Sequence, residues 1–144
     1  HTVIVDNAGG HLMQNGKVDL CIVGSDRTAM NGDVCNKIGT YLKAISAYDN
    51  NIPFYVALPT STIDRNLKKG SDIPIEIRDG KELSDLNFEK SNKLFTGRIY
   101  KNKTSTFNPA FDVTPSKFIT ALITENGICE ANYSSIKKKL KKLL

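Results

Sequence analysis

The sequence predicts an α/β protein with a doubly wound, Rossmann-like parallel sheet and helices on both of its faces. Three apolar runs have the length and β-branched content of strands, and they alternate with two stretches whose apolar residues recur at helical spacing. The strand runs are 2–5, 19–24 and 53–58, and the helical stretches are 8–15 and 33–48. This alternation is the order of a parallel sheet with right-handed crossovers.

The two helical stretches have recognisable ends. Residues 8–15 form a short helix that Gly16 closes. Asn31 or Asp33 is a plausible N-cap for the longer helix. Its apolar face then consists of Val34, Ile38, Leu42 and Ile45.

Beyond residue 58 the pattern becomes less regular. Residues 73–77 are predicted as an edge strand, because Pro74 cannot donate a hydrogen bond to a central ladder. Residues 79–106 are weakly patterned and are expected to form loops and one short helix. A further helix is predicted to have Thr114 as its N-cap, Pro115 at its first position and Gly127 at its end.

Length and charge favour a single domain over residues 1–132, followed by a basic amphipathic tail over 133–144. Five of the 20 basic residues lie in that tail, and the rest of the chain has 15 basic and 15 acidic residues. The tail could contact nucleic acid or an anionic surface, or be a solvated helix. We expect no nucleic-acid partner, because the chain has no aromatic stacking motif and no zinc knuckle.

The cysteines and the apolar runs indicate where in the cell the protein is expected to reside. Cys21, Cys35 and Cys129 are an odd, widely spaced set, so we expect free thiols and no metal site. A helix N-terminus could lower the pKa of Cys35, but a bystander role is the favoured interpretation. No apolar run is long enough to span a membrane and no signal peptide is evident, so we expect a cytoplasmic protein without membrane contact.

A polar cluster between residues 24 and 40 is the candidate site, because it follows a strand at the sheet edge where ligands bind in open α/β folds. Asp26 is the candidate general acid/base. Asn36 and Lys37 would hold an oxygen-rich anionic ligand in the first turn of the helix. The alternative is a capped helix with surface ion pairs, Asp26 with Arg27 or Asp33 with Lys37.

Polar residues from two later segments belong to the same part of the sheet. Ser61, Thr62 and Asp64 follow the third strand and would face the same edge as Asp26, although Ser61 or Thr62 could simply cap a short helical segment. Asp112 is a second candidate carboxylate, or it satisfies backbone amides in a turn.

Five stretches resemble, in order, the methylthioribose-1-phosphate isomerases. This family shares a superfamily with the alpha, beta and delta subunits of translation initiation factor 2B and with ribose-bisphosphate isomerases. The stretches are 24–27 (GSDR), 31–41 (NGDVCNKIGTY), 52–57 (IPFYVA), 61–64 with 73–76 (STID and IPIE), and 108–115 (NPAFDVTP). The STID and IPIE segments resemble the isomerase branch. The match runs over 3–128 and resembles the C-terminal domain of an enzyme more than twice as long.

The resemblance implies an aldose-ketose isomerase that converts 5-methylthioribose 1-phosphate into 5-methylthioribulose 1-phosphate in methionine salvage. Asp26 would be its catalytic acid/base, and Asn36 and Lys37 would contact the substrate. Because phosphate blocks the anomeric oxygen, an acid must help to open the ring, and a carboxylate in a dry pocket could do so. No cofactor and no metal are implied.

The resemblance also implies what the chain lacks and what it binds. The family's catalytic cysteine, phosphate-binding arginine and glycine segments and a substrate-binding glutamine belong to an N-terminal region, so we expect this chain to be inactive alone. Cys35 stands where the family usually has alanine, so it cannot replace that cysteine. The expected partners are a small sugar phosphate and a second copy of the chain or a separate N-terminal half. The alternative is a non-catalytic assembly protein like the initiation factor 2B subunits.

Overall fold

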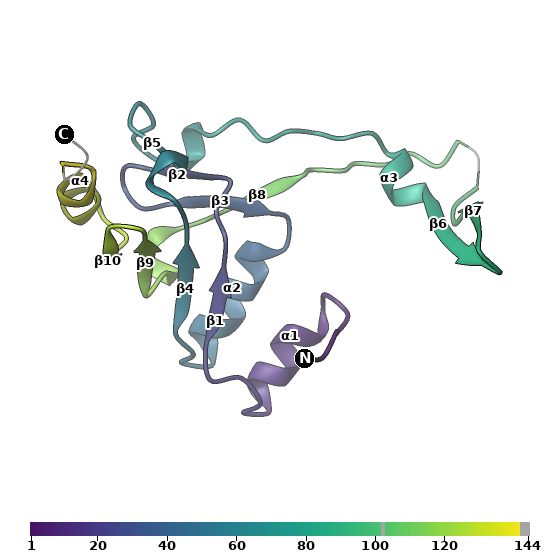
Figure 1. The fold of residues 1–144 in the computed structure, drawn as a ribbon, viewed down its shortest axis with the longest axis horizontal. Coiled ribbons are helices and arrows are strands. Elements are labelled where there is room, and N and C mark those ends of the chain that lie inside the picture. The colour runs from purple at the N-terminus through teal and green to yellow at the C-terminus, as the bar shows by residue number, and fades with distance from the viewer. Residues whose placement is uncertain (102, 142–144) are drawn as a thin grey trace. The chain divides into compact units, whose positions relative to one another are not determined.

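The structure is a computed structural model that describes residues 1–101 and 103–141 (Figure 1). The chain forms two compact units. Unit 1 comprises His1–Pro74 and Phe111–Leu144, and unit 2 comprises Ile75–Ala110. The helices and strands that carry the candidate site all belong to unit 1. Unit 2 is described after it.

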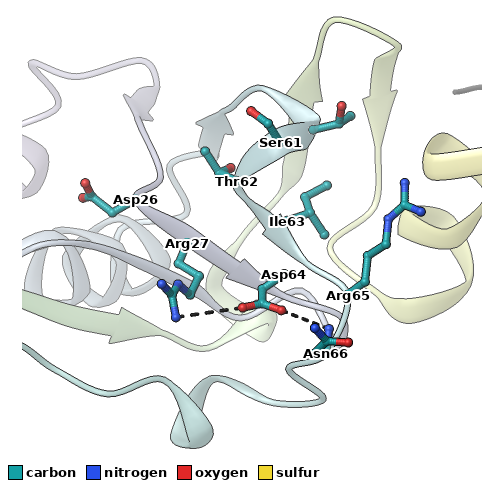
Figure 2. Close-up of a pocket in the computed structure, with 9 residues that line it drawn as sticks. Asp26, Arg27, Ser61, Thr62, Ile63, Asp64, Arg65 and Asn66 are labelled. Atoms are coloured by element: carbon teal, nitrogen blue, oxygen red, sulfur yellow. Dashed lines mark hydrogen bonds and ion pairs between the residues drawn. The ribbon is translucent and has the colours of Figure 1, made fainter.

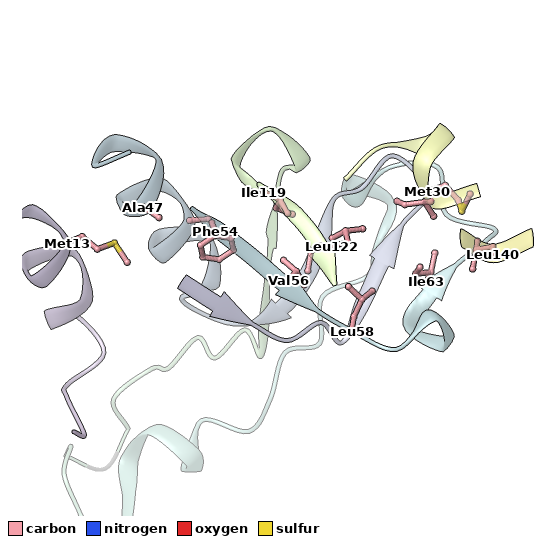
Figure 3. Packing of buried hydrophobic residues seen from close by; sticks show 13 residues of the cluster. Met13, Met30, Ala47, Phe54, Val56, Leu58, Ile63, Ile119, Leu122 and Leu140 are labelled. Atoms are coloured by element: carbon pink, nitrogen blue, oxygen red, sulfur yellow. The ribbon is translucent and has the colours of Figure 1, made fainter. Parts of the chain in front are cut away.

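The first sheet of unit 1 is called the core sheet here. In spatial order its strands are β1 (Cys21–Val23), β4 (Phe54–Ala57), β9 (Ala121–Thr124) and β10 (Gly127–Cys129). The first three are parallel to one another, and β10 runs antiparallel to β9. The side chains of its residues Phe54, Val56 and Leu122 are completely buried in the hydrophobic core (Figure 3). The predicted α/β class with a parallel sheet is confirmed, as are the strands predicted over 19–24 and 53–58.

The second sheet of unit 1 is called the site sheet. In spatial order its strands are β5 (Ile63–Asp64), β2 (Arg27–Ala29), β3 (Val34–Lys37) and β8 (Phe111–Thr114). Strand β3 is antiparallel to both β2 and β8, whereas β2 and β5 are parallel. Strands β2 and β3 form a hairpin whose turn contains Asn31 and Gly32, and Gly32 has a φ of 92°. Asn-Gly between two strands is a strong hairpin signal.

Among its described residues, unit 1 also contains three helices and three short 3₁₀ turns. They are α1 (Ala8–Gln14), α2 (Thr40–Asp49), α4 (Tyr133–Lys141), η1 (Thr60–Thr62), η2 (Gly70–Asp72) and η3 (Ser116–Phe118). Helix α1 packs on α2, and α2 packs on β4 and β8. The short helix predicted over 8–15 is confirmed. No helix within the described residues is long and apolar enough to cross a membrane.

Helix α4 carries most of the predicted basic tail. Its residues Ile136 and Leu140 are buried in the core cluster, so the apolar side of the helix packs against the rest of unit 1. Lys139 also donates a 3.0 Å hydrogen bond to the carbonyl of Asn126. The last part of the predicted tail, residues 142–144, lies outside the described residues.

Three predicted elements of unit 1 are wrong. Residues 2–5 form no strand. The helix predicted from Asp33 begins only at Thr40, because residues 34–37 pair with strands on both sides and become β3. The helix predicted after Thr114 is instead η3, β9 and β10. Leu122 there pairs with Val56, a contact that local spacing cannot show.

Unit 2 contains α3 (Lys81–Ser84) and an antiparallel hairpin of β6 (Asp85–Lys90) and β7 (Lys93–Arg98). Its two-residue loop, Ser91 and Asn92, has φ values of 52° and 60°, as a type I′ turn requires. The predicted short helix exists, but the hairpin was not predicted. The edge strand predicted over 73–77 is wrong, since only an isolated bridge joins Ile77 to Pro109.

Candidate functional site

Asp26 lies at the edge of the site sheet, immediately before β2. Its backbone N–H donates a 2.9 Å hydrogen bond to the carbonyl of Cys35. Arg27 of β2 pairs with Cys35 of β3, so both Asp26 and Arg27 lie opposite Cys35, whereas Asn36 pairs with Asp112 of β8. Directly opposite residues of antiparallel strands share one face. Asn36 and Asp112 therefore share a face of the site sheet, and Asp26 lies next to Cys35 at the start of β2.

The side chain of Asn36 is tied to the start of helix α2. Its Nδ2 donates to Thr40 Oγ1 at 3.1 Å, and that hydroxyl donates to the carbonyl of Lys37 at 2.7 Å. A Cβ added at Gly24 would lie 3.9 Å from Asn36 Oδ1, so this amide oxygen is close to the chain that leads into Asp26. Asn36 thus lies near Gly24, two residues before Asp26, and it belongs to strand β3 and not to a helical turn as predicted.

Asp112 caps helix α2. Its Oδ2 accepts a 2.7 Å hydrogen bond from the N–H of Gly39, and its Oδ1 accepts one of 3.0 Å from the N–H of Tyr41. A carboxylate at this place neutralises the positive end of the helix dipole. The interpretation of Asp112 as a residue that satisfies backbone amides is confirmed, and the helix end is not free for an anionic ligand.

Lys37 is exposed and ends β3. Consecutive side chains in a strand point to opposite faces, so Lys37 does not share the face of Asn36. The surface ion pairs that formed the alternative interpretation are both absent from the described residues. Arg27 pairs instead with Asp64, with 3.9 Å between Nη1 and Oδ2. The structure therefore places Asn36 near Gly24 on the chain that leads into Asp26, and it leaves Lys37 exposed on the other face of β3.

Asp33 is a structural carboxylate and not a helix cap. Its Oδ2 accepts hydrogen bonds from the N–H of Gly70 at 2.9 Å and from Asn31 Nδ2 at 2.8 Å. Its Oδ1 accepts a 2.9 Å hydrogen bond from the N–H of Ser116. A Cβ at Gly70 would lie 2.6 Å from the Asp33 Cβ, so glycine is needed there. Asp33 therefore links three chain segments: its own turn and two distant ones, at Gly70 and Ser116.

An open cleft of about 760 Å³ adjoins Asp26 (Figure 2). It is lined by Asp26, Arg27 and residues 60–66, whereas Asn36 and Lys37 are not among its lining residues. Asp26 is exposed, so the dry pocket expected around it is not formed by the described residues. The cleft is nevertheless large enough for a small ligand.

One wall of the cleft is fixed by Glu125, which the sequence interpretation missed. Its carboxylate accepts hydrogen bonds from both the N–H and the hydroxyl of Thr60, the first residue of η1. The Thr60 hydroxyl is the main cause that holds the pKa of Glu125 below its ordinary value. The two residues are 65 positions apart, so no local pattern links them.

The cysteines are free thiols, as predicted. Burial is the main cause that raises the pKa of Cys35 to about 11, and the negative charges of Asp26 and Asp112 raise it further. Burial also raises the pKa of Cys21 and Cys129. Cys35 is therefore protonated at neutral pH, which makes it a poor nucleophile. Within residues 1–101 and 103–141, no group of three His, Cys, Asp or Glu residues could hold a metal ion.

Comparisons with known proteins agree with the motifs. A family model described as the initiation factor 2 subunit family matches residues 1–131. Methylthioribose-1-phosphate isomerase from Methylorubrum extorquens is 59% identical over 134 residues, which are 92% of this chain and 37% of that protein. The enzyme of the same name from Escherichia coli is 57% identical over 137 residues, or 94% of this chain and 37% of that protein.

Two solved structures share the fold. The 5-methylthioribose 1-phosphate isomerase from Pyrococcus horikoshii has a TM-score of 0.84 and 42% identity, covering 96% of this chain and 37% of that one. Translation initiation factor eIF-2B, subunit delta, from A. fulgidus has a TM-score of 0.82 and 40% identity, covering 97% and 38%. The chain spans little more than a third of the relatives' length. From its family match and these identities, the chain belongs to the initiation factor 2 subunit family, with methylthioribose-1-phosphate isomerases among its relatives.

Proposed function

We propose that this chain supplies the C-terminal part of the active site of a methylthioribose-1-phosphate isomerase. The observation that carries the proposal is the open cleft lined by Asp26, in a chain 59% identical over 134 residues to a protein of that name. The reaction would convert 5-methylthioribose 1-phosphate into 5-methylthioribulose 1-phosphate. The substrate is therefore a small sugar phosphate.

Asp26 acts as the acid and base of this reaction. Its protonated carboxyl gives a proton to the ring oxygen as the bond from that oxygen to C1 breaks. The hydrogen on C2 then moves to C1 as a hydride, with its bonding electron pair. The C2 hydroxyl loses its proton as C2 becomes a carbonyl. The Asp26 carboxylate accepts that proton, so the net change is an isomerisation without a redox partner. General acid-base catalysis by one positioned carboxyl contributes about 10²–10⁴-fold.

Asn36 and Lys37 orient the sugar phosphate at the end of β3. The Asn36 amide is held by Thr40, so its position is fixed before the substrate binds. Lys37 is a cation at the exposed end of the strand, and it stabilises negative charge on the ligand.

The remainder of the active site comes from a region outside this chain. Asp26 is exposed here, and an acid that opens a sugar ring needs a site from which water is excluded. The chain also leaves large apolar side chains exposed, including Val3 at 91%, Val5 at 76% and Leu42 at 63%. We expect these surfaces to be covered by an N-terminal part of the enzyme or by a second copy in a homodimer. A cytoplasmic location remains a prediction.

Reconstitution tests the proposal. The isolated 144-residue chain is expected to show no turnover of methylthioribose 1-phosphate. Turnover is expected when the chain is joined to the N-terminal part of the Methylorubrum extorquens enzyme, in place of that enzyme's own matching part. Turnover by the isolated chain would contradict the proposed division of the site, and an inactive but folded chimera would contradict the proposed function.

A second candidate function is a non-catalytic assembly role. The observation that favours it is the likeness to the eIF-2B delta subunit from A. fulgidus, at a TM-score of 0.82 and 40% identity. Under this alternative the folded chimera would form a stable oligomer without turning over the sugar phosphate. Mass measurement together with the turnover assay separates the two functions.

A further inference from the structure

The hydroxyl groups around the cleft differ in whether the protein itself uses them. Thr60 donates its hydroxyl to Glu125, and Thr62 donates to the carbonyl of Pro59 at 3.0 Å. Ser25 and Thr28, at the start of the neighbouring strand, share a 2.8 Å hydrogen bond. Ser61 lines the cleft and is exposed, and its hydroxyl has no hydrogen-bond partner in the part of the chain that the structure describes. It is free to bind a ligand.

Ser61 lies in the same cleft as the candidate acid/base. Thr28 of β2 pairs with Ile63 of β5, and the segments that lead into these two strands carry Asp26 and Ser61. Both side chains line the same cleft, as Figure 2 shows. The carboxylate of Asp26 also has no partner within the described residues, so two free polar groups flank one space.

The segment that presents Ser61 is held on both sides. Glu125 binds the backbone N–H of Thr60 at 2.9 Å, and the N–H of Thr62 donates to the carbonyl of Pro59 at 3.0 Å. Asp64, the next acidic group along the wall, is already occupied by Arg27 and by the N–H of Asn66. The backbone that carries Ser61 is thus held in place before a ligand binds, which reduces the ordering cost of a hydrogen bond from its side chain.

We propose that Ser61 is a substrate-binding residue that hydrogen-bonds the C3 hydroxyl of the sugar. This inference rests on the proposed function. In 5-methylthioribose 1-phosphate the C1 oxygen carries phosphate, the C2 hydroxyl reacts, the C4 oxygen closes the ring and C5 carries sulfur. The C3 hydroxyl is the one hydroxyl that the reaction leaves unchanged, and it is adjacent to the reacting C2. A hydroxyl in the same cleft as Asp26 is suited to hold it.

The test uses the active chimera with Ser61→Ala, Ser61→Thr and the control Ser71→Ala, an exposed serine outside the cleft. Loss of one such hydrogen bond is expected to lower kcat/KM about tenfold. Ser61→Thr keeps the hydroxyl and should therefore retain most of the parent's kcat/KM. Ser71→Ala should have the same kcat/KM as the parent. On a 3-deoxy substrate, Ser61→Ala and the parent should have equal kcat/KM. The thermal midpoint should not change, because the Ser61 hydroxyl has no internal partner.

Each outcome separates this inference from the proposed function. An active parent chimera in which Ser61→Ala has unchanged kinetics on both substrates would overturn the role of Ser61 and leave the isomerase function intact. An equal loss on both substrates together with a lower thermal midpoint would assign Ser61 a structural role and also overturn the inference. A folded parent chimera without turnover would overturn both proposals.

Discussion

The core sheet and the site sheet belong to the same unit but use their residues differently. The core sheet consists mainly of parallel strands and buries Phe54, Val56 and Leu122 completely. The site sheet consists of short strands that also bury Val34 completely, but Asp26 precedes its strand β2 at the cleft. The largest fully buried side chain of this unit belongs to the first sheet, so truncation there should cost the most stability, and the proposed chemistry depends on the second sheet. Substitutions in each sheet can test this division.

Phe54→Ala should have the largest effect on stability. The side chain is 1% exposed at the centre of the core sheet, and truncating a buried phenylalanine costs about 3–5 kcal/mol through lost burial and a residual cavity. Chemical denaturation measures the loss. Ile22→Ala in the same sheet is the matched control, since Ile22 is 58% exposed and its truncation should cost far less. Equal losses for the two variants would contradict the assigned core.

Asp33→Ala should have the next largest effect, although it lies at the site sheet. The substitution leaves the N–H groups of Gly70 and Ser116 without their acceptor, and an unsatisfied buried donor costs about 1–3 kcal/mol. Asp72→Ala removes an exposed carboxylate of a nearby turn and serves as the control in the same denaturation experiment. If Asp33→Ala is no less stable than Asp72→Ala, the link between the three segments does not contribute to folding.

Asp112→Ala should destabilise the protein by about 1 kcal/mol, the usual value of a helix N-cap. The loss should be local, because Asp112 binds the N–H groups of Gly39 and Tyr41 at the start of α2. Hydrogen exchange of these two amides should accelerate more than exchange in the core sheet. Unchanged protection at Tyr41 would show that another group caps this helix.

The smallest effect is a pH dependence of stability from Glu125. Hydrogen bonds from Thr60, first its hydroxyl, lower the pKa of Glu125 in the folded state below the ordinary 4.5. The stabilisation is therefore fully present above pH 4.5 and is lost as the pH falls through the lower folded pKa. Unfolding measured between pH 6 and pH 3 should show a weaker acid dependence for Glu125→Gln. The same slope in both proteins would rule out this contribution.

The sequence predicted the core sheet better than the site sheet for a physical reason. Strands β1 and β4 are continuous apolar runs, so composition alone reveals them. Strand β3 exists because β2 and β8 pair with it. Val34 and Ile38 nevertheless continue the helical spacing of the apolar residues in α2, so the sequence predicted a helix there. Asn31-Gly32 was the local signal for a hairpin there, and it was interpreted as part of a helix start.

The predicted site residues lie on neighbouring segments, but Asn36 and Lys37 belong to a strand and not to the first turn of a helix. The motifs identified Asp26, which lines the cleft, and Asn36, which lies outside its lining. The predicted use of the helix N-terminus failed because Asp112, more than 70 positions away from Gly39, occupies it. The contacts of Glu125 with Thr60 are also long-range. Sequence spacing reports which polar residues are present, whereas tertiary contacts decide which of them remain free to bind a ligand.

The most direct test of the account is the turnover of methylthioribose 1-phosphate by the chimera with Asp26→Asn. The exposed carboxylate has no partner within the described residues, so the substitution should leave the free energy of unfolding unchanged. Its removal should lower kcat by about 10²–10⁴-fold if Asp26 is the acid and base. Turnover equal to that of the parent chimera would contradict the assignment of the site sheet as the catalytic half of this unit.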